Sequence, residues 1–128
     1  MSVDLKMSVL IVDDYATMLR VVKSLLKQIG FENVDEATDG GEAYLMMKRK
    51  KYGLVISDWN MQPVTGIEFL RNVRKDPELR ATPFIMVTAE SKKDNVVEAK
   101  NAGVSNYIVK PFSSEVLKGK IASVLGEF

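Results

Sequence analysis

The sequence predicts one α/β domain with a doubly wound, parallel five-stranded sheet in the flavodoxin-like order 2-1-3-4-5. Three observations lead to this prediction. Short apolar runs alternate with longer stretches of helical periodicity five times along the chain. Strands that are joined by helical crossovers are parallel and connect in the right-handed sense. The 128 residues suffice for one domain with one core, so residues 1–128 are expected to form a single unit without an output domain.

The first two units show how each element is assigned. Residues 9–12 form the first apolar run, and apolar residues at helical spacing then continue over residues 18–29. Gly30 follows at the position that commonly ends a helix. Residues 34–37 predict a weaker strand, because two acidic residues interrupt it, and an edge position in the sheet tolerates such an interruption. A second helix is predicted over residues 41–50.

The remaining three units repeat the alternation. Their strands are predicted at residues 54–57, 84–87 and 107–109. Their helices are predicted at residues 67–74, 92–102 and 113–125. The first of these strands is the most apolar, which favours a central position. In the predicted order it lies beside the first strand, at the point where ligands of open α/β sheets bind outside the carboxyl ends of the strands.

Composition excludes several classes of function. The chain contains no cysteine, which rules out disulfide frameworks and thiol nucleophiles, and no histidine, which rules out histidine general bases and Ser-His-Asp triads. Eighteen basic and seventeen acidic residues give a net charge of +1, so neither a nucleic-acid nor a membrane partner is expected. There is no secretory signal and no apolar run near the roughly 20 residues that span a bilayer, so we expect a cytoplasmic protein.

Chemically useful side chains follow four of the predicted strands. In chain order they are Asp13 with Asp14, Asp58, Thr88 and Lys110. The carboxyl ends of parallel strands meet at one edge of the sheet, so these carboxylates, the hydroxyl and the ammonium are expected to lie together. Helix capping would explain one of the acids alone. Strand propensity would explain Thr88, and Lys110 would be an ordinary exposed lysine. None of these explains the recurrence at successive strand ends.

This acidic edge predicts a divalent cation site. Clustered carboxylates repel one another, and a hard cation with oxygen ligands removes the repulsion. In this interpretation Asp14 and Asp58 each supply an oxygen, Asp13 acts through water, and the carbonyl of Asn60 lies close by. Mg²⁺, or Mn²⁺ in its place, is favoured over zinc because the chain has neither histidine nor cysteine. A carboxylate beside Mg²⁺ is also a competent phosphoryl acceptor, whose other oxygens the ammonium and the hydroxyl would hold.

Other uses of the predicted fold agree less well with the residues. A flavin phosphate site needs a loop rich in serine, threonine and glycine after the first strand, where this chain has Asp13-Asp14-Tyr15. The Walker A motif and the Rossmann glycine motif are both absent. An aspartate-nucleophile phosphohydrolase carries a second aspartate two residues after the first, and Asn60 stands in that position here. The phosphohydrolase is therefore an open but disfavoured alternative.

These residues, at these spacings, resemble the receiver domain of bacterial two-component response regulators over essentially the entire chain. The motifs that carry the resemblance are Asp13-Asp14, Asp58, Thr88-Ala89 and Lys110-Pro111-Phe112. Longer stretches resemble the stand-alone chemotaxis regulators of the CheY type in particular. They are Asp58-Trp59-Asn60-Met61, Val87-Thr88-Ala89-Glu90 and Tyr107-Ile108-Val109-Lys110-Pro111-Phe112.

The resemblance implies a phosphorylation switch. Asp58 would accept a phosphoryl group from a histidine of a separate sensor kinase. The magnesium ligands would be Asp13, Asp14, Asp58 and the Asn60 carbonyl. Such a domain assists its own phosphorylation and dephosphorylation, and no turnover of an external substrate is expected. Asn60 and Glu90 would set the lifetime of the phosphorylated state.

The resemblance also implies how the signal leaves the site. Lys110 would contact the phosphoryl group, aimed by a cis Lys110-Pro111 bond. Thr88 would move toward the phosphoryl group and Tyr107 would rotate inward behind it. The face that binds the target would include Lys92, Lys93, Val96, Tyr107 and Lys120. Receivers usually have Met-Pro and then Asp-Gly after the phosphoacceptor, whereas here the order is Met61-Gln62-Pro63-Val64-Thr65-Gly66, so the turn is expected to differ in shape.

The partners implied are a chemotaxis histidine kinase of the CheA type as phosphodonor and a flagellar motor switch protein of the FliM type as target. A phosphatase is a further implied partner, and the chain is expected to be a monomer. A phosphorelay intermediate, or a phosphate-sink receiver without a motor target, is the alternative. Phosphorylation-dependent binding to a motor-switch peptide separates these two functions.

Overall fold

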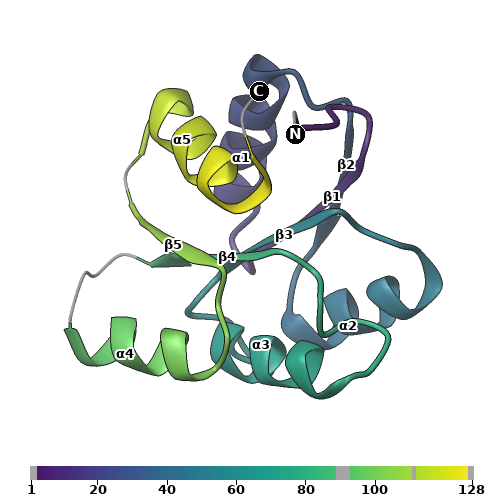
Figure 1. The fold of residues 1–128 in the computed structure, drawn as a ribbon, viewed down its shortest axis with the longest axis vertical. Coiled ribbons are helices and arrows are strands. Elements are labelled where there is room, and N and C mark those ends of the chain that lie inside the picture. The colour runs from purple at the N-terminus through teal and green to yellow at the C-terminus, as the bar shows by residue number, and fades with distance from the viewer. Residues whose placement is uncertain (1–2, 89–92, 111, 127–128) are drawn as a thin grey trace.

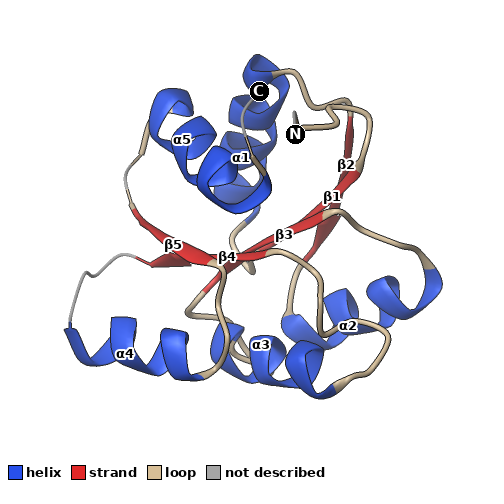
Figure 2. Cartoon of the chain, in the orientation of Figure 1, coloured by secondary structure: helices blue, strands red, loops and turns tan. Residues whose placement is uncertain are grey.

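In a computed structural model the chain folds into alternating strands and helices (Figure 2). The structure describes residues 3–88, 93–110 and 112–126. The strands are β1 Ser8–Val12, β2 Asn33–Ala37, β3 Leu54–Asp58, β4 Phe84–Thr88 and β5 Asn106–Val109. The helices are α1 Ala16–Ile29, α2 Gly40–Arg49, α3 Gly66–Lys75, α4 Lys93–Asn101 and α5 Ser114–Leu125. Each predicted strand and helix is present, with bounds within a few residues of those expected.

The strands form one parallel sheet in the order β2-β1-β3-β4-β5, which confirms the predicted topology. Helices α1 and α5 cover one face of the sheet, and α2, α3 and α4 cover the other (Figure 1). Strand β2 lies at an edge and is partly exposed, as its two interrupting acids predicted. The order places β1 beside β3, so the acids at the carboxyl ends of these two strands are neighbours.

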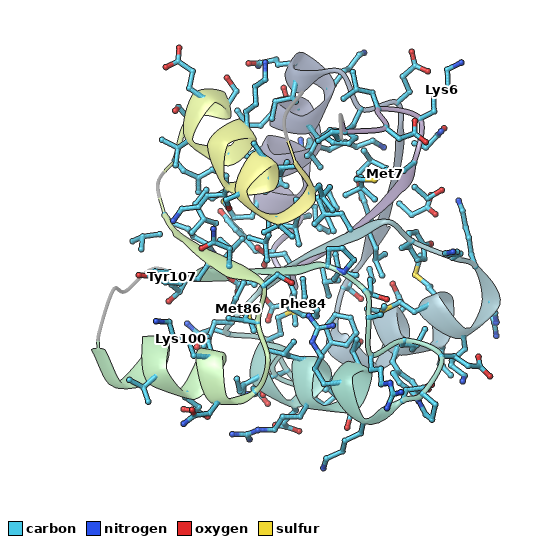
Figure 3. The ribbon with its side chains drawn as sticks, in the orientation of Figure 1. Lys6, Met7, Phe84, Met86, Lys100 and Tyr107 are labelled. Atoms are coloured by element: carbon cyan, nitrogen blue, oxygen red, sulfur yellow. The ribbon has the colours of Figure 1, made fainter. Side chains whose placement is uncertain are left out.

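Each face of the sheet is buried in its own core, because neighbouring residues of a strand point to opposite sides. Leu10 and Val12 of β1 join the core beneath α2 and α3, while the residues between and before them join the core beneath α1 and α5. Phe84 and Met86 of β4 lie on the α3 side (Figure 3), where the ring of Phe84 is 5.3 Å from that of Phe69. Burial of each large apolar side chain contributes about 1.5–3 kcal/mol, which fixes the strand ends that carry the acids.

Capping residues define where three of the helices begin. Asp39, Thr65 and Ser113 each accept a hydrogen bond from backbone N–H groups in the first turn of α2, α3 and α5. Helix α1 differs, since its N-cap Tyr15 makes no side-chain capping bond. The N-terminus of α1 follows Asp13 and Asp14 directly, and the positive end of its dipole favours negative charge there.

Arg74, the last residue of the predicted third helix, makes hydrogen bonds to two loops. Its Nη1 donates to the carbonyls of Arg80 and Thr82 at 2.9 and 2.6 Å, and its Nε donates to the carbonyl of Gly103 at 2.7 Å. The partly buried guanidinium thus joins α3 to the segment before β4 and to the loop after α4. Hydrogen bonds to a charged donor are stronger than neutral ones, so Arg74 holds these loops in place.

The turn after Asp58 contains a cis peptide bond between Gln62 and Pro63, in the stretch where the sequence departs from the usual receiver pattern. The expected cis bond between Lys110 and Pro111 involves residue 111, which lies outside the described residues. Within the described ranges, no helix has both the length and the apolar character required to cross a bilayer.

Candidate functional site

Parallel register brings the functional side chains to one edge of the sheet. In the pairing of β1 with β3, Val12 lies opposite Ser57, so Asp13 and Asp58 follow at the same level. Strand β4 ends on Thr88, one residue beyond the partner of Asp58. The edge is therefore assembled by strand length and register, and not by any one loop.

Three carboxylates meet at this edge. One oxygen each from Asp13, Asp14 and Asp58 lies within 4.8 Å of the others. Asp13 and Asp58 are buried, each with 6% of its surface exposed, whereas Asp14 is exposed. The cluster thus has two buried oxygen donors and one donor open to solvent.

Lys110 supplies a cation to this cluster. Its Nζ lies 2.8 Å from Oδ1 of Asp58 and 3.9 Å from Oδ2 of Asp13. The backbone N–H of Lys110 donates to the carbonyl of Thr88 at 2.8 Å, which sets the point where the chain leaves β5. Three acids and one ammonium leave an excess of negative charge at the edge.

Burial, and to a smaller extent the neighbouring acids, affect the pKa of Asp13. Burial raises the pKa of Asp13 to about 6, and the nearby Asp58 carboxylate acts in the same direction. The backbone N–H of Tyr15, which donates to Oδ1 of Asp13 at 3.0 Å, opposes this rise. Ionising this carboxyl group beside two others is costly, and a bound hard divalent cation would offset that cost.

The loop after Asp58 is held by contacts that the sequence analysis did not identify. The hydroxyl of Ser57 donates to the carbonyl of Asp58 at 3.1 Å, and the Trp59 N–H donates to the carbonyl of Val87 at 2.9 Å. The N–H of Gly66 then donates to the carbonyl of Trp59 at 2.9 Å. From the sequence, Ser57 is predicted only as part of the strand; the available signal was a hydroxyl residue directly before Asp58 in an otherwise apolar run.

Thr88 and Tyr107 lie on the same side of the sheet. Thr88 is the buried last residue of β4, and the register pairs Tyr107 with Met86, two residues earlier on that strand. Alternation then directs all three side chains toward the face that α3 and α4 cover. Tyr107 is half-buried on the edge strand β5 (Figure 3), and the Lys120 ammonium lies 5.1 Å from its ring centroid.

The other residues expected at the site or on the partner face are placed only in part. Asn60 is exposed in the loop after Asp58. Glu90 and Lys92 lie outside the described residues, and Lys93 and Val96 are placed only as members of α4. The structure therefore brings together the three acids, Lys110 and Thr88, while the role of Asn60 and Glu90 in lifetime stays a prediction.

Mg²⁺ is expected to bind the three acids and to change the fluorescence of Trp59 in a saturable manner. Trp59 is the only tryptophan, is half-buried and directly follows Asp58, so metal binding alters the charge next to its indole. The measurement is an emission titration of the parent, of Asp14→Ala and of Asp4→Asn as a control for lost charge elsewhere. An unchanged parent, or an Asp14→Ala response equal to that of the parent, would contradict the site.

Known proteins resemble this chain over nearly its whole length. The family model of the response regulator receiver domain matches residues 9–122. The chain is 48% identical over 118 residues to the chemotaxis protein CheY-3 of Vibrio cholerae, which covers 92% of this chain and 91% of that protein. It is also 48% identical over 118 residues to the chemotaxis protein CheY of Pseudomonas aeruginosa, with 92% and 95% of the two chains covered.

Solved structures show the same architecture. The chemotaxis response regulator CheY4 of Vibrio cholerae superposes with a TM-score of 0.86 at 34% identity, over 94% of this chain and 99% of that one. The range that the family model matches contains all three acids, Thr88 and Lys110. The comparisons therefore span the sheet and the acidic edge together.

Proposed function

This chain belongs to the response regulator receiver domain family and is of the chemotaxis CheY type, and we propose that it is a phosphorylation-activated switch with Asp58 as phosphoacceptor. The observation that carries this proposal is the pairing of Asp58 with Lys110 at 2.8 Å inside a cluster of three acids. A buried carboxylate that pairs with an ammonium, among acids that would hold a cation, is suited to receive a dianionic group.

The donor set is suited to Mg²⁺. It consists of carboxylate oxygens from Asp13, Asp14 and Asp58, two of them buried, in a chain without histidine or cysteine. We assign these three residues and the Asn60 carbonyl as the residues that would hold the ion. When bound, Mg²⁺ supplies positive charge that offsets repulsion between the acids and an incoming phosphoryl group.

In the proposed transfer, a carboxylate oxygen of Asp58 forms a bond to phosphorus as the bond from phosphorus to the kinase histidine nitrogen breaks. The product is an aspartyl phosphate, and the released imidazole takes up a proton. Lys110 is already held at the acceptor by its backbone bond to Thr88, so its ammonium can pair with the phosphoryl oxygens without rearrangement of the strand.

The signal is proposed to leave the site through Thr88 and Tyr107. A phosphoryl group on Asp58 offers strong acceptor oxygens, and the Thr88 hydroxyl gains one of them by moving toward it. Because Thr88 and Tyr107 project to the same side of neighbouring strands, this movement changes the packing available to the tyrosine ring. The face around Lys93, Val96, Tyr107 and Lys120 then presents a different surface to a target.

The proposed phosphodonor is a chemotaxis histidine kinase, and the proposed target is the flagellar motor switch. The chemotaxis proteins of Vibrio cholerae and Pseudomonas aeruginosa that resemble this chain support chemotaxis over a phosphorelay role. The test is affinity for a motor-switch peptide with and without acetyl phosphate and Mg²⁺. Tighter binding by the phosphorylated chain supports the proposal, and equal affinity favours the phosphate-sink alternative.

Thr88→Ala is expected to accept phosphate at Asp58 but to gain little affinity for the motor-switch peptide. Coupling of this kind is typically worth about 1–3 kcal/mol, or roughly 5- to 150-fold in affinity, and the variant should lose most of it. Thr82→Ala, two residues before the start of the same strand, is the matched control and should behave as the parent. Should phosphorylated Thr88→Ala bind as tightly as the phosphorylated parent, the Thr88–Tyr107 route is wrong.

A further inference from the structure

A hollow lies at the edge of the sheet opposite to Asp58. Its volume is about 730 Å³, and it is lined where α2 ends and where the chain enters β3 and β4. Tyr52 and Gly53 lead into β3, and Pro83 leads into β4, so the hollow opens at the amino ends of these strands. Nothing in the proposed phosphorylation switch uses this region.

Beside the exposed acid Glu78, basic side chains line the hollow. They are the consecutive residues Lys48, Arg49, Lys50 and Lys51. Two of the four are already neutralised by ion pairs. The pairs are Lys48 with Asp76 at 3.0 Å and Glu78 at 3.1 Å, and Lys50 with Asp35 at 2.9 Å.

Arg49 and Lys51 remain available. Both are exposed, and neither has a salt-bridge partner within the described ranges. Arg49 lies in the last turn of α2, where a cation also favours the helix dipole. Lys51 lies beyond the end of that helix, so the helix dipole does not explain a cation at this position. Two exposed cations of the lining thus face solvent.

The floor of the hollow is apolar. Met47, Tyr52 and Leu79 line it and are buried in the core beneath α2 and α3. Leu45 lies one helical turn before Arg49 on α2 and has 57% of its surface exposed. Leu45 therefore lies beside Arg49 on the exposed surface of α2, outside the lining of the hollow.

We propose that this hollow, together with Leu45, binds an acidic segment of a partner protein that also carries apolar side chains. Carboxylates of the segment would pair with Arg49 and Lys51, and an apolar side chain would contact Leu45 and the floor. Charge complementarity favours an acidic ligand, and the apolar floor favours a peptide over a phosphate backbone, which offers no side chain to fill it. A flat membrane surface would not reach the floor of a hollow.

This proposal does not depend on phosphorylation of Asp58. The hollow and the acidic cluster lie at opposite ends of the strands, so a ligand can occupy the hollow in either state of the switch. Binding should consequently survive in Asp58→Asn, which separates failure of this proposal from failure of the proposed phosphorylation.

The test is fluorescence anisotropy with a labelled peptide in which glutamates flank two leucines, and with the same peptide carrying glutamines instead. The double variant Arg49→Gln with Lys51→Gln should bind the acidic peptide roughly 5- to 10-fold more weakly than the parent. The matched control, Arg20→Gln with Lys27→Gln, removes the same two charges from exposed positions of α1 and should differ by less than about twofold. Leu45→Ser should also weaken binding.

Three results would overturn the proposal. The first is equal affinity of the acidic peptide for the hollow variant and the α1 control, and the second is equal affinity of the parent for the acidic and glutamine peptides. The third is that a short DNA duplex, or vesicles of phosphatidylglycerol and phosphatidylcholine, bind the parent as tightly as the acidic peptide and lose affinity equally in the hollow variant. Circular dichroism of each variant verifies that the fold is retained.

Discussion

Gly66→Ala is expected to lower the free energy of unfolding by about 2–4 kcal/mol and to displace the loop that carries the acceptor. A Cβ atom at this position would lie 2.2 Å from the carbonyl oxygen of Asp58 and 2.9 Å from Cα of Trp59, both of them backbone atoms that no rotamer change can move. The N–H of Gly66 also donates to the carbonyl of Trp59, so the close approach is part of the turn itself. Gly66 is therefore required for packing against the site.

The measurement is urea denaturation, and the control is Gly119→Ala. A Cβ at Gly119 meets nothing within 4 Å in the interior of α5, so alanine there should raise stability by about 0.5–1 kcal/mol. Trp59 emission should shift in Gly66→Ala and stay unchanged in Gly119→Ala. If both variants are equally stable, the turn accommodates a side chain and the tight contact with Asp58 has no consequence.

Asp13→Asn is expected to stabilise the metal-free protein at pH 7, by about 1–2 kcal/mol, and to remove most of the stabilisation that Mg²⁺ gives. Burial raises the pKa of Asp13 to about 6 from its ordinary value of 3.8, so ionising this group in the folded state is costly. The full shift corresponds to about 3 kcal/mol, and water near the exposed Asp14 reduces it. Asparagine keeps an acceptor for the Tyr15 N–H without the charge.

The pH dependence follows from the direction of that shift. A carboxyl group with a raised folded-state pKa contributes its stability below about pH 4 and loses it as the pH rises through about 6. Without metal, the parent should therefore weaken relative to Asp13→Asn across this window, and Mg²⁺ should restore the parent by binding the folded state. Glu32→Gln, an exposed acid at the opposite edge, controls for charge. A parent and an Asp13→Asn variant with parallel pH profiles would contradict the assignment.

The sequence was sufficient for the fold and for the convergence of the acids. Alternating apolar runs and helical stretches determine a parallel sheet, and a parallel sheet aligns its strand ends. Position along the strands was enough to place three of the side chains together: Asp13 follows β1, and Asp58 and Thr88 end β3 and β4. Lys110 followed in the same way from the end of β5.

Features that depend on the path of loops could not be predicted from the sequence. Arg74 binds carbonyls at Arg80, Thr82 and Gly103, up to 29 residues away, and no periodicity marks such contacts. The basic hollow likewise exists because the end of α2 meets the segments before β3 and β4. The close approach of Gly66 to Asp58 depends on the shape of the turn between them.

The identity of the phosphoacceptor is tested most directly by incubating the parent, Asp58→Asn and Asp4→Asn with acetyl phosphate, with and without Mg²⁺, and mapping the product by mass spectrometry. We expect one phosphoryl group per chain, carried by Asp58, in the parent and in Asp4→Asn, and only when Mg²⁺ is present. Asp58→Asn should remain folded and unlabelled, because a polar exchange at a strand end leaves both cores intact. A phosphoryl group on any other residue of the parent, or equal labelling of folded Asp58→Asn, would show that Asp58 is not the phosphoacceptor.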